Sequence, residues 1–200
     1  MSSTLYLTLG LACCSLAPTT PFPSRTSAER MPFPKKVYEF VTPLKQPKGN
    51  DCWIATYTMM RRWKDKQHAL SIEQVLAGMK PVYANLYKNN SGLPGTRRAA
   101  FFVDNGLTPM APQNFTLAGW ASLIQDHGPV SVDVFSQNVD DMVWMHALLL
   151  VGVDTDTQVF TYIDPATGKE DSTSFLEFLR KYEGVVTEGD QHDFIQVFHL

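Results

Sequence analysis

Hydrophobic and polar positions follow a helical period in the first half of the chain. From residue 52 to about 66, Trp53 and Tyr57 recur at helical spacing, and Asn50 or Asp51 stands where a helix cap is expected. The best-defined helix start therefore lies at residue 52. Capping residues and the same period predict further helices at 71–78, 96–105 and 116–128.

In the second half the pattern changes to short runs of β-branched and apolar residues separated by turn residues. These runs predict strands at 130–135, 147–153 and 159–163, followed by a helix at 174–182 and a closing strand at 194–199. A weak alternation at 37–41 predicts an edge strand. This order predicts an α+β fold, in which an N-terminal helical part packs against a C-terminal antiparallel sheet.

Residues 1–36 differ from the rest of the chain. An apolar stretch is followed by a segment rich in Pro, Ser and Thr, whose prolines forbid a continuous helix. The apolar stretch resembles a signal-peptide core, but no Lys or Arg precedes it. Three interpretations of this stretch are open: a cleaved export signal, an unstructured leader, or the end of a region removed from a longer parent. We predict a leader and linker at 1–36 and one domain at 37–200.

Composition excludes several function classes. The net charge is −3 in 200 residues, so no excess of Lys and Arg is present to neutralise nucleic-acid phosphates or anionic lipid. No apolar run reaches the roughly 20 residues that a membrane-spanning helix needs. Cys13 and Cys14 are adjacent and Cys52 stands alone, which argues against a disulfide scaffold. The sequence therefore predicts a free thiol at Cys52. It predicts neither nucleic-acid binding nor a membrane-spanning helix.

Cys52 lies in the first turn of its predicted helix. The unpaired N–H groups and the dipole of a helix start favour the thiolate, which is the nucleophilic form of cysteine. The alternative is a small buried residue that packs the helix against the sheet. Position alone makes Cys52 a candidate nucleophile and leaves the packing role open.

His146 is the candidate base. It opens the most apolar strand of the chain, HALLLVGV, where an imidazole is an unusual choice unless its position is useful. A core histidine with satisfied hydrogen bonds is the alternative. Surface or helix-capping roles suffice for the other histidines, which are His68, His127, His192 and His199.

Asp164 is the candidate carboxylate that orients the base. The strands at 147–153 and 159–163 predict an antiparallel hairpin, and folding about Thr155 places His146 directly across from Asp164. The carboxylate would then accept the imidazole Nδ1–H. A register shift of one residue would break this pairing. Asp164 before a proline is also a good turn after any strand. Other aspartates fit less well, namely Asp133, Asp154 and Asp156.

Gln46 is the candidate oxyanion donor. Attack of a thiolate on a carbonyl produces an oxyanion, which preorganised N–H groups stabilise. The backbone N–H of Cys52 is one such donor, and Gln46 lies six residues upstream on the loop that leads into the helix. A loop glutamine is more often a solvated residue, so this role depends chiefly on a resemblance.

Several motifs together resemble one family. Gln46 stands six residues before Cys52-Trp53, as in the active-site opening of papain-like proteases. The later motifs are similar to the compact bacterial branch of that superfamily: Gly128-Pro129 before a strand, His146 at the start of HALLLVGV, and Asp164-Pro165 ahead of Gly168. That branch includes avirulence-type effector proteases of plant pathogens and, more distantly, peptidases that remove bacteriocin leaders. The resemblance covers residues 44–168.

The resemblance implies a papain-like fold. The helix bearing Cys52 would face the sheet bearing His146 and Asp164 across a cleft. Ile54 and Thr56 depart from the family, because relatives usually carry small alanines there. This departure bears on the substrate more than on the chemistry.

The leading functional hypothesis is a thiol endopeptidase acting as a bacterial secreted effector or toxin on a protein of another cell. Its partners would be a protein or peptide substrate and a cognate immunity or inhibitor protein; without such delivery the chain is expected in the cytoplasm. The same residues also allow glutamine deamidation, transglutamination or cell-wall amide cleavage. A third alternative is a non-catalytic binding module. No metal or cofactor is expected, because His and Cys never occur at the close spacings of zinc ligands.

Overall fold

The computed structural model of the chain describes residues 35–137, 143–187 and 195–200. The predicted leader and linker lies outside this part of the chain except for its last residues. The elements follow the predicted α+β order. The helices are α1 (Cys52–Asp65), α2 (Ile72–Ala77), α3 (Pro81–Lys88), α4 (Gly95–Asp104), α5 (Leu117–His127) and α6 (Phe175–Thr187). The strands are β1 (Lys36–Tyr38), β2 (Thr108–Pro109), β3 (Val130–Gln137), β4 (Val143–Asp154), β5 (Val159–Asp164), β6 (Lys169–Ser174) and β7 (Val197–His199).

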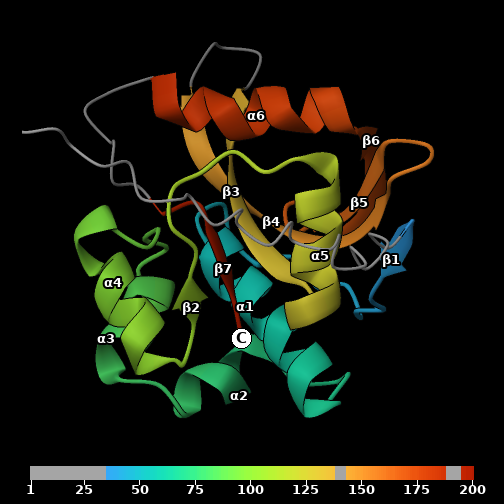
Figure 1. Cartoon of the computed structure of the whole chain (residues 1–200). Helices are drawn as coiled ribbons and strands as arrows, with labels where there is room; N and C mark the ends of the chain where they lie inside the picture. Colours follow the sequence, from blue (N-terminus) through green and yellow to red (C-terminus); the bar gives the residue numbers. More distant parts are fainter. Residues whose placement is uncertain (1–34, 138–142, 188–194) are drawn as a thin grey trace, which may run out of the picture. The chain divides into compact units, whose positions relative to one another are not determined.

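One antiparallel sheet organises the described residues (Figure 1). Its strand order is β2-β7-β3-β4-β5-β6, and the short β1 pairs with the end of β4. β4 lies between β3 and β5 and is buried along most of its length. A strand covered on both faces has no polar side to alternate with, which explains the continuous apolar run in its sequence.

The two faces of β4 enter two apolar clusters. Leu149 joins a cluster with α1 to α4, in which Ile54 of α1 is fully buried. Leu148 and Leu150 join the other cluster, which contains Trp120 of α5 and residues of α6. Full burial of one large aliphatic side chain is worth about 1.5–3 kcal/mol, so α1 is held firmly against its face of the sheet.

The hairpin of β4 and β5 contains a shift in register. Asp154 pairs with Val159 next to the turn, but the register changes by one residue at Val151, which marks a β-bulge. The carbonyl of Val151 accepts a hydrogen bond from Glu39 N at 2.8 Å, just after β1. The expectation that the hairpin folds symmetrically about Thr155 is therefore wrong, because the turn is centred later in the chain.

Helix α3 and strand β6 have no counterpart among the sequence predictions. α3 begins with Pro81 at its first position. Its apolar residues recur at helical spacing and pack toward the core, a signal that the prediction missed: Val82, Tyr83, Leu86 and Tyr87. β6 is an edge strand of polar, mostly exposed residues. The strand predicted at 194–199 is found as β7, although residue 194 lies outside the described residues. Within the described ranges, no helix has the length and apolar content to cross a membrane.

Candidate active site

Cys52 is the first residue of α1, and its thiol is free and partly buried. The first hydrogen bond of the helix runs from Ala55 N to the carbonyl of Asp51 at 3.0 Å, so the Cys52 N–H has no partner inside the helix. Asp51 takes the N-cap position, but its side chain makes no capping bond. A backbone donor therefore lies beside the thiol at the positive end of the helix.

Thr56 attaches the helix of Cys52 to the strand of His146. Its buried hydroxyl donates to the carbonyl of Ala147 at 3.4 Å. An alanine at this position could not make this contact. Thr56 therefore has a structural role one residue away from the candidate base, while Ile54 belongs to the core.

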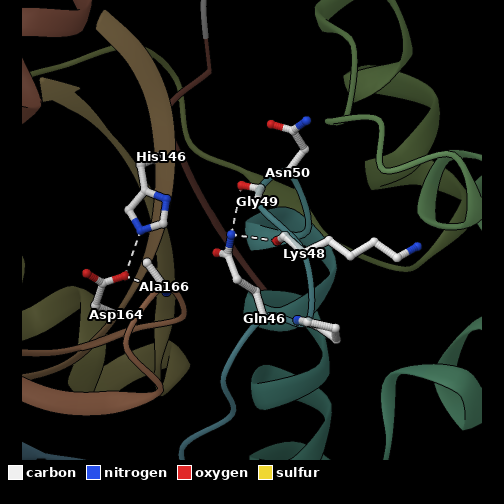
Figure 2. Close-up of a pocket in the computed structure, with 8 residues that line it drawn as sticks. Gln46, Lys48, Gly49, Asn50, His146, Asp164 and Ala166 are labelled. Atoms are coloured by element: carbon white, nitrogen blue, oxygen red, sulfur yellow. Dashed lines mark hydrogen bonds and ion pairs between the residues drawn. The ribbon is translucent and has the colours of Figure 1, made fainter. Parts of the chain in front are cut away.

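His146 and Asp164 are hydrogen-bonded to each other. His146 Nε2 lies 2.7 Å from Asp164 Oδ1, which also accepts a bond from Ala166 N at 2.8 Å (Figure 2). The contact uses Nε2, so the expected bond through Nδ1 is a wrong detail of the prediction. Cys52 interacts with His146 closely enough to raise the pKa of the imidazole, and the two residues line the same cavity. The imidazole thus lies between the carboxylate and the thiol.

His146 and Asp164 share a face of the hairpin without being opposite each other. Continued from the observed pairs, the register places Leu148 opposite Asp164. His146 lies two residues from Leu148 and therefore on the same face, as a diagonal neighbour of the carboxylate. Without the bulge at Val151 the register would differ by one residue, and His146 would point to the other face.

The surroundings of His146 favour its charged form. Burial lowers the pKa of the imidazole, but the hydrogen bond to Asp164 and the interaction with Cys52 outweigh burial and raise this pKa to about 9. For Asp164, burial raises the pKa, whereas the bonds from His146 and from Ala166 N lower it below the usual value of an aspartate. An imidazolium held in this way can stabilise a neighbouring thiolate.

Three of the cavities in the described residues are lined by His146. The large cavity has a volume of about 500 Å³, and Figure 2 shows the His146–Asp164 pair on one side of it and the loop before α1 on the other. The small cavity measures about 130 Å³ and is lined by both Cys52 and His146. Its apolar walls include Trp53, Leu93 and Met145. The third measures about 360 Å³ and is lined by His146, Asp164 and Leu148. The candidate base therefore borders open space on several sides.

Gln46 lines the large cavity, but its donors are already engaged. Gln46 Nε2 donates to the carbonyls of Lys48 and Gly49, at 2.8 Å in each case. These carbonyls can only accept, which fixes the orientation of the amide. Gln46 Oε1 is buried without a partner among the described residues, and in Figure 2 it lies on the side toward His146. Its role as an oxyanion donor remains a prediction.

A buried ion pair at the small cavity escaped the sequence reasoning. Arg98 of α4 and Asp133 of β3 form this pair, and they are only 9% and 4% exposed. Arg98 Nη2 also donates to the carbonyl of Ile195 at 3.0 Å. The sequence signal for this pair was the carboxylate of Asp133 inside an apolar strand. Only the packing of the fold identifies Arg98 as its partner.

Asp51 places a second buried carboxylate beside the nucleophile. Its side chain is fully buried, and neither oxygen has a hydrogen-bond partner among the described residues. Burial raises the pKa of Asp51, and the positive charge of Lys48 opposes that shift. In the part of the chain that the structure describes, no group of three or more His, Cys, Asp or Glu side chains is placed to hold a metal ion.

Comparison with known proteins agrees with the resemblance seen in the motifs. A family model described as papain-like cysteine protease AvrRpt2 matches residues 37–183. The matched range contains the candidate residues Gln46, Cys52, His146 and Asp164 and extends from β1 into α6. No curated protein matches the chain. The family match, together with the α+β order and the antiparallel sheet, confirms the expected papain-like fold.

Proposed function

Because the chain belongs to the family of papain-like cysteine proteases, we propose that it is a thiol endopeptidase that cleaves a protein substrate. The observation that carries this proposal is the position of His146, which is hydrogen-bonded to Asp164 and lines one cavity together with Cys52. A nucleophile, a base and a group that orients the base are the parts that acyl transfer through cysteine requires.

In the first step, the Cys52 thiolate attacks the carbonyl carbon of the scissile peptide bond. A carbon–sulfur bond forms, and the carbonyl oxygen becomes an oxyanion. His146 holds the proton that the thiol has lost and donates it to the leaving nitrogen as the carbon–nitrogen bond breaks. Asp164 keeps the ring in place through Nε2. The amine product leaves, and the acyl group remains on Sγ.

In the second step, water enters beside His146, which is now neutral. The imidazole takes a proton from the water as its oxygen attacks the thioester. The carbon–sulfur bond then breaks, the acid product leaves, and the thiolate–imidazolium pair is restored. The large cavity, which His146 and Asp164 line, gives water access to this side of the imidazole.

The oxyanion of both steps requires N–H donors. The backbone N–H of Cys52 is the first donor, because the helix leaves it without an internal partner. Gln46 is proposed as the second donor. To reach the oxyanion, its Nε2 gives up one of the two bonds to the carbonyls of Lys48 and Gly49. A charged acceptor forms a stronger bond than a neutral carbonyl, which favours this exchange.

The proposal is tested by N-terminal profiling of a susceptible proteome. Samples are treated with the full chain or with its Cys52→Ala variant, after circular dichroism has shown that both are folded. We expect new protein N-termini with the unaltered chain and none with the variant. Equal cleavage by the two proteins would refute Cys52 as the nucleophile. A mass gain on glutamine side chains without new termini would instead identify a deamidase.

We also propose that the protein acts after export, as an effector or toxin in a target cell. Support comes from the match to an effector-type family and from the signal-like apolar stretch near the N-terminus. Expression of the full chain in a bacterial host, with the medium and the cells assayed separately, tests this proposal. Export should require residues 1–34, and a chain that stays in the cells with or without them would refute it.

A further inference from the structure

The loop that leads into α1 is held from two sides. We call residues 46–51 the nucleophile loop. On the sheet side, Gln46 N donates to the carbonyl of Pro165 at 2.8 Å, in the turn after β5. On the helical side, Lys48 Nζ donates to the carbonyl of Tyr87 at 2.7 Å, near the end of α3. The loop therefore bridges the sheet and a helix that is distant from it in sequence.

A pair of asparagines forms the anchor of this loop that lies nearest to α1. The backbone N–H of Asn50 donates to Asn90 Oδ1 at 3.1 Å, and Asn50 Nδ2 donates to the carbonyl of Asn90 at 2.8 Å. Asn90 has a φ of 52°, in the left-handed region that asparagine adopts more readily than most residues. Its conformation turns the side chain toward the nucleophile loop just after α3 ends.

The first turn of α1 begins two residues after this anchor. Many helices fix their first turn with a side chain at the N-cap, but Asp51 makes no such bond. The peptide group between Asp51 and Cys52 is held by the helix on one side, where the Asp51 carbonyl accepts from Ala55 N at 3.0 Å, and by the loop on the other. Asn50 lies in that loop, one residue before Asp51, and its N–H is the one that Asn90 holds.

We propose that Asn90 is a positioning residue for the reaction: through Asn50, it fixes the Cys52 N–H in the direction of the oxyanion. This inference rests on the proposed function. The Asn90 carboxamide oxygen is the atom that matters, since the second bond between the two asparagines uses the Asn90 backbone and survives any substitution there. Asn90 is expected to affect steps that form an oxyanion and to leave other reactions of the thiolate unchanged.

Two small reagents separate these effects. With p-nitrophenyl acetate, the thiolate attacks an ester carbonyl, an oxyanion forms, p-nitrophenolate leaves and the acetyl group stays on Sγ. With iodoacetamide, the thiolate displaces iodide at a saturated carbon, and no oxyanion forms. Both reactions need the same thiolate, so the ratio of their rates reports the oxyanion donors alone. Neither reagent requires knowledge of the natural substrate.

The experiment uses the full chain with Cys13→Ser and Cys14→Ser, so that Cys52 is its single thiol. Asn90→Gly removes the side-chain acceptor and tolerates the positive φ without strain. Asn90→Asp keeps an acceptor oxygen at the same place and also tolerates this φ. We expect Asn90→Gly to lower the ratio of acetylation to alkylation about tenfold, and Asn90→Asp to keep it within about twofold of the parent.

An unchanged ratio in Asn90→Gly would overturn the proposal, as would an equal loss in Asn90→Asp. A parallel fall of both rates would also overturn it, because Asn90 would then act on the thiolate or on folding. These outcomes are independent of whether the chain is a protease. The Cys52→Ala comparison described above decides that question, and a failure there leaves the ratio test valid.

Discussion

The two sides of the candidate site are assembled in different ways. His146 and Asp164 lie on adjacent strands of one hairpin, 18 residues apart in the chain. The nucleophile loop is held by side chains that reach backbone groups about 40 positions away, as in the bonds of Lys48 and Asn50. On the hairpin side, the register of β4 and β5 decides whether His146 and Asp164 lie on the same face or on opposite faces, with no arrangement in between. On the loop side, several separate hydrogen bonds hold the nucleophile loop, so the loss of one bond should disturb its geometry only partly.

Loss of the base is the most severe change on the hairpin side. His146→Ala removes the group that holds the thiolate and protonates the leaving amine, so we expect proteolysis to fall by roughly a thousandfold or more. Turnover of a quenched fluorescent peptide library measures the loss. His68→Ala is the control, because His68 is exposed and its ring is hydrogen-bonded to Thr42 and lies against Phe40, away from the candidate site. A surviving rate near that of the control would exclude His146 as the base.

Loss of the orienting charge should cost less. Asp164→Asn keeps the shape of the side chain but removes the negative charge that supports the imidazolium, and we expect kcat to fall about a hundredfold. The pH profile sharpens this test. Since the pKa of His146 is raised to about 9, activity should decline near that pH in the unaltered chain. In Asp164→Asn the decline should begin at lower pH; a profile that does not move would contradict the role of Asp164.

A change on the loop side should be graded. Lys48→Met removes the ammonium that binds the end of α3, and we expect a several-fold loss of kcat together with a loss of about 1 kcal/mol in the free energy of unfolding. Urea denaturation and the peptide-library assay measure the two effects. Lys88→Met is the matched control, because the Lys88 side chain is exposed. Complete inactivation by Lys48→Met would contradict this expectation, because it would mean that the loop tolerates the loss of a single bond no better than the hairpin tolerates a shift of register.

The smallest effect is expected at Asp51, and it depends on pH. Burial raises the pKa of this carboxyl, so ionising Asp51 destabilises the fold, and stability is lost as the pH rises through the raised pKa. Asp51→Asn cannot ionise and should melt at a higher temperature than the unaltered chain at pH 8. The difference should disappear near pH 4. Asp126→Asn, at an exposed position, should show no such trend, and equal melting curves for Asp51→Asn would refute the argument.

Local patterns were sufficient where the structure is local. The start of α1 at Cys52 follows from helical spacing, and the Ser71 capping box predicted α2 together with its first turn. His146 and Asp164 were found because a hairpin makes positions on both sides of a turn into neighbours. The predicted register was wrong by an even number of residues. His146 and Asp164 therefore lie on the same face of the hairpin, as expected, although they are not directly opposite each other.

Features that depend on distant parts of the chain could not be predicted. The bulge at Val151 lies where β4 changes its neighbour from β3, which ends its pairing at Leu150, to β1, which begins at Gly152. No local pattern reports such a change of partner. Arg98 and Asp133 could not be predicted as a pair for the same reason. The sequence around Arg98 predicts an ordinary helix and that around Asp133 an apolar strand, and the two side chains meet only in the packed fold.

The bulge at Val151 also constrains how this protein can be altered or recombined. A turn of another length, taken from a different hairpin, would shift the register of β5 against β4. A shift of one residue would place Asp164 and His146 on opposite faces. Transplanting the turn, the bulge and β1 together as one unit would keep the two side chains on the same face.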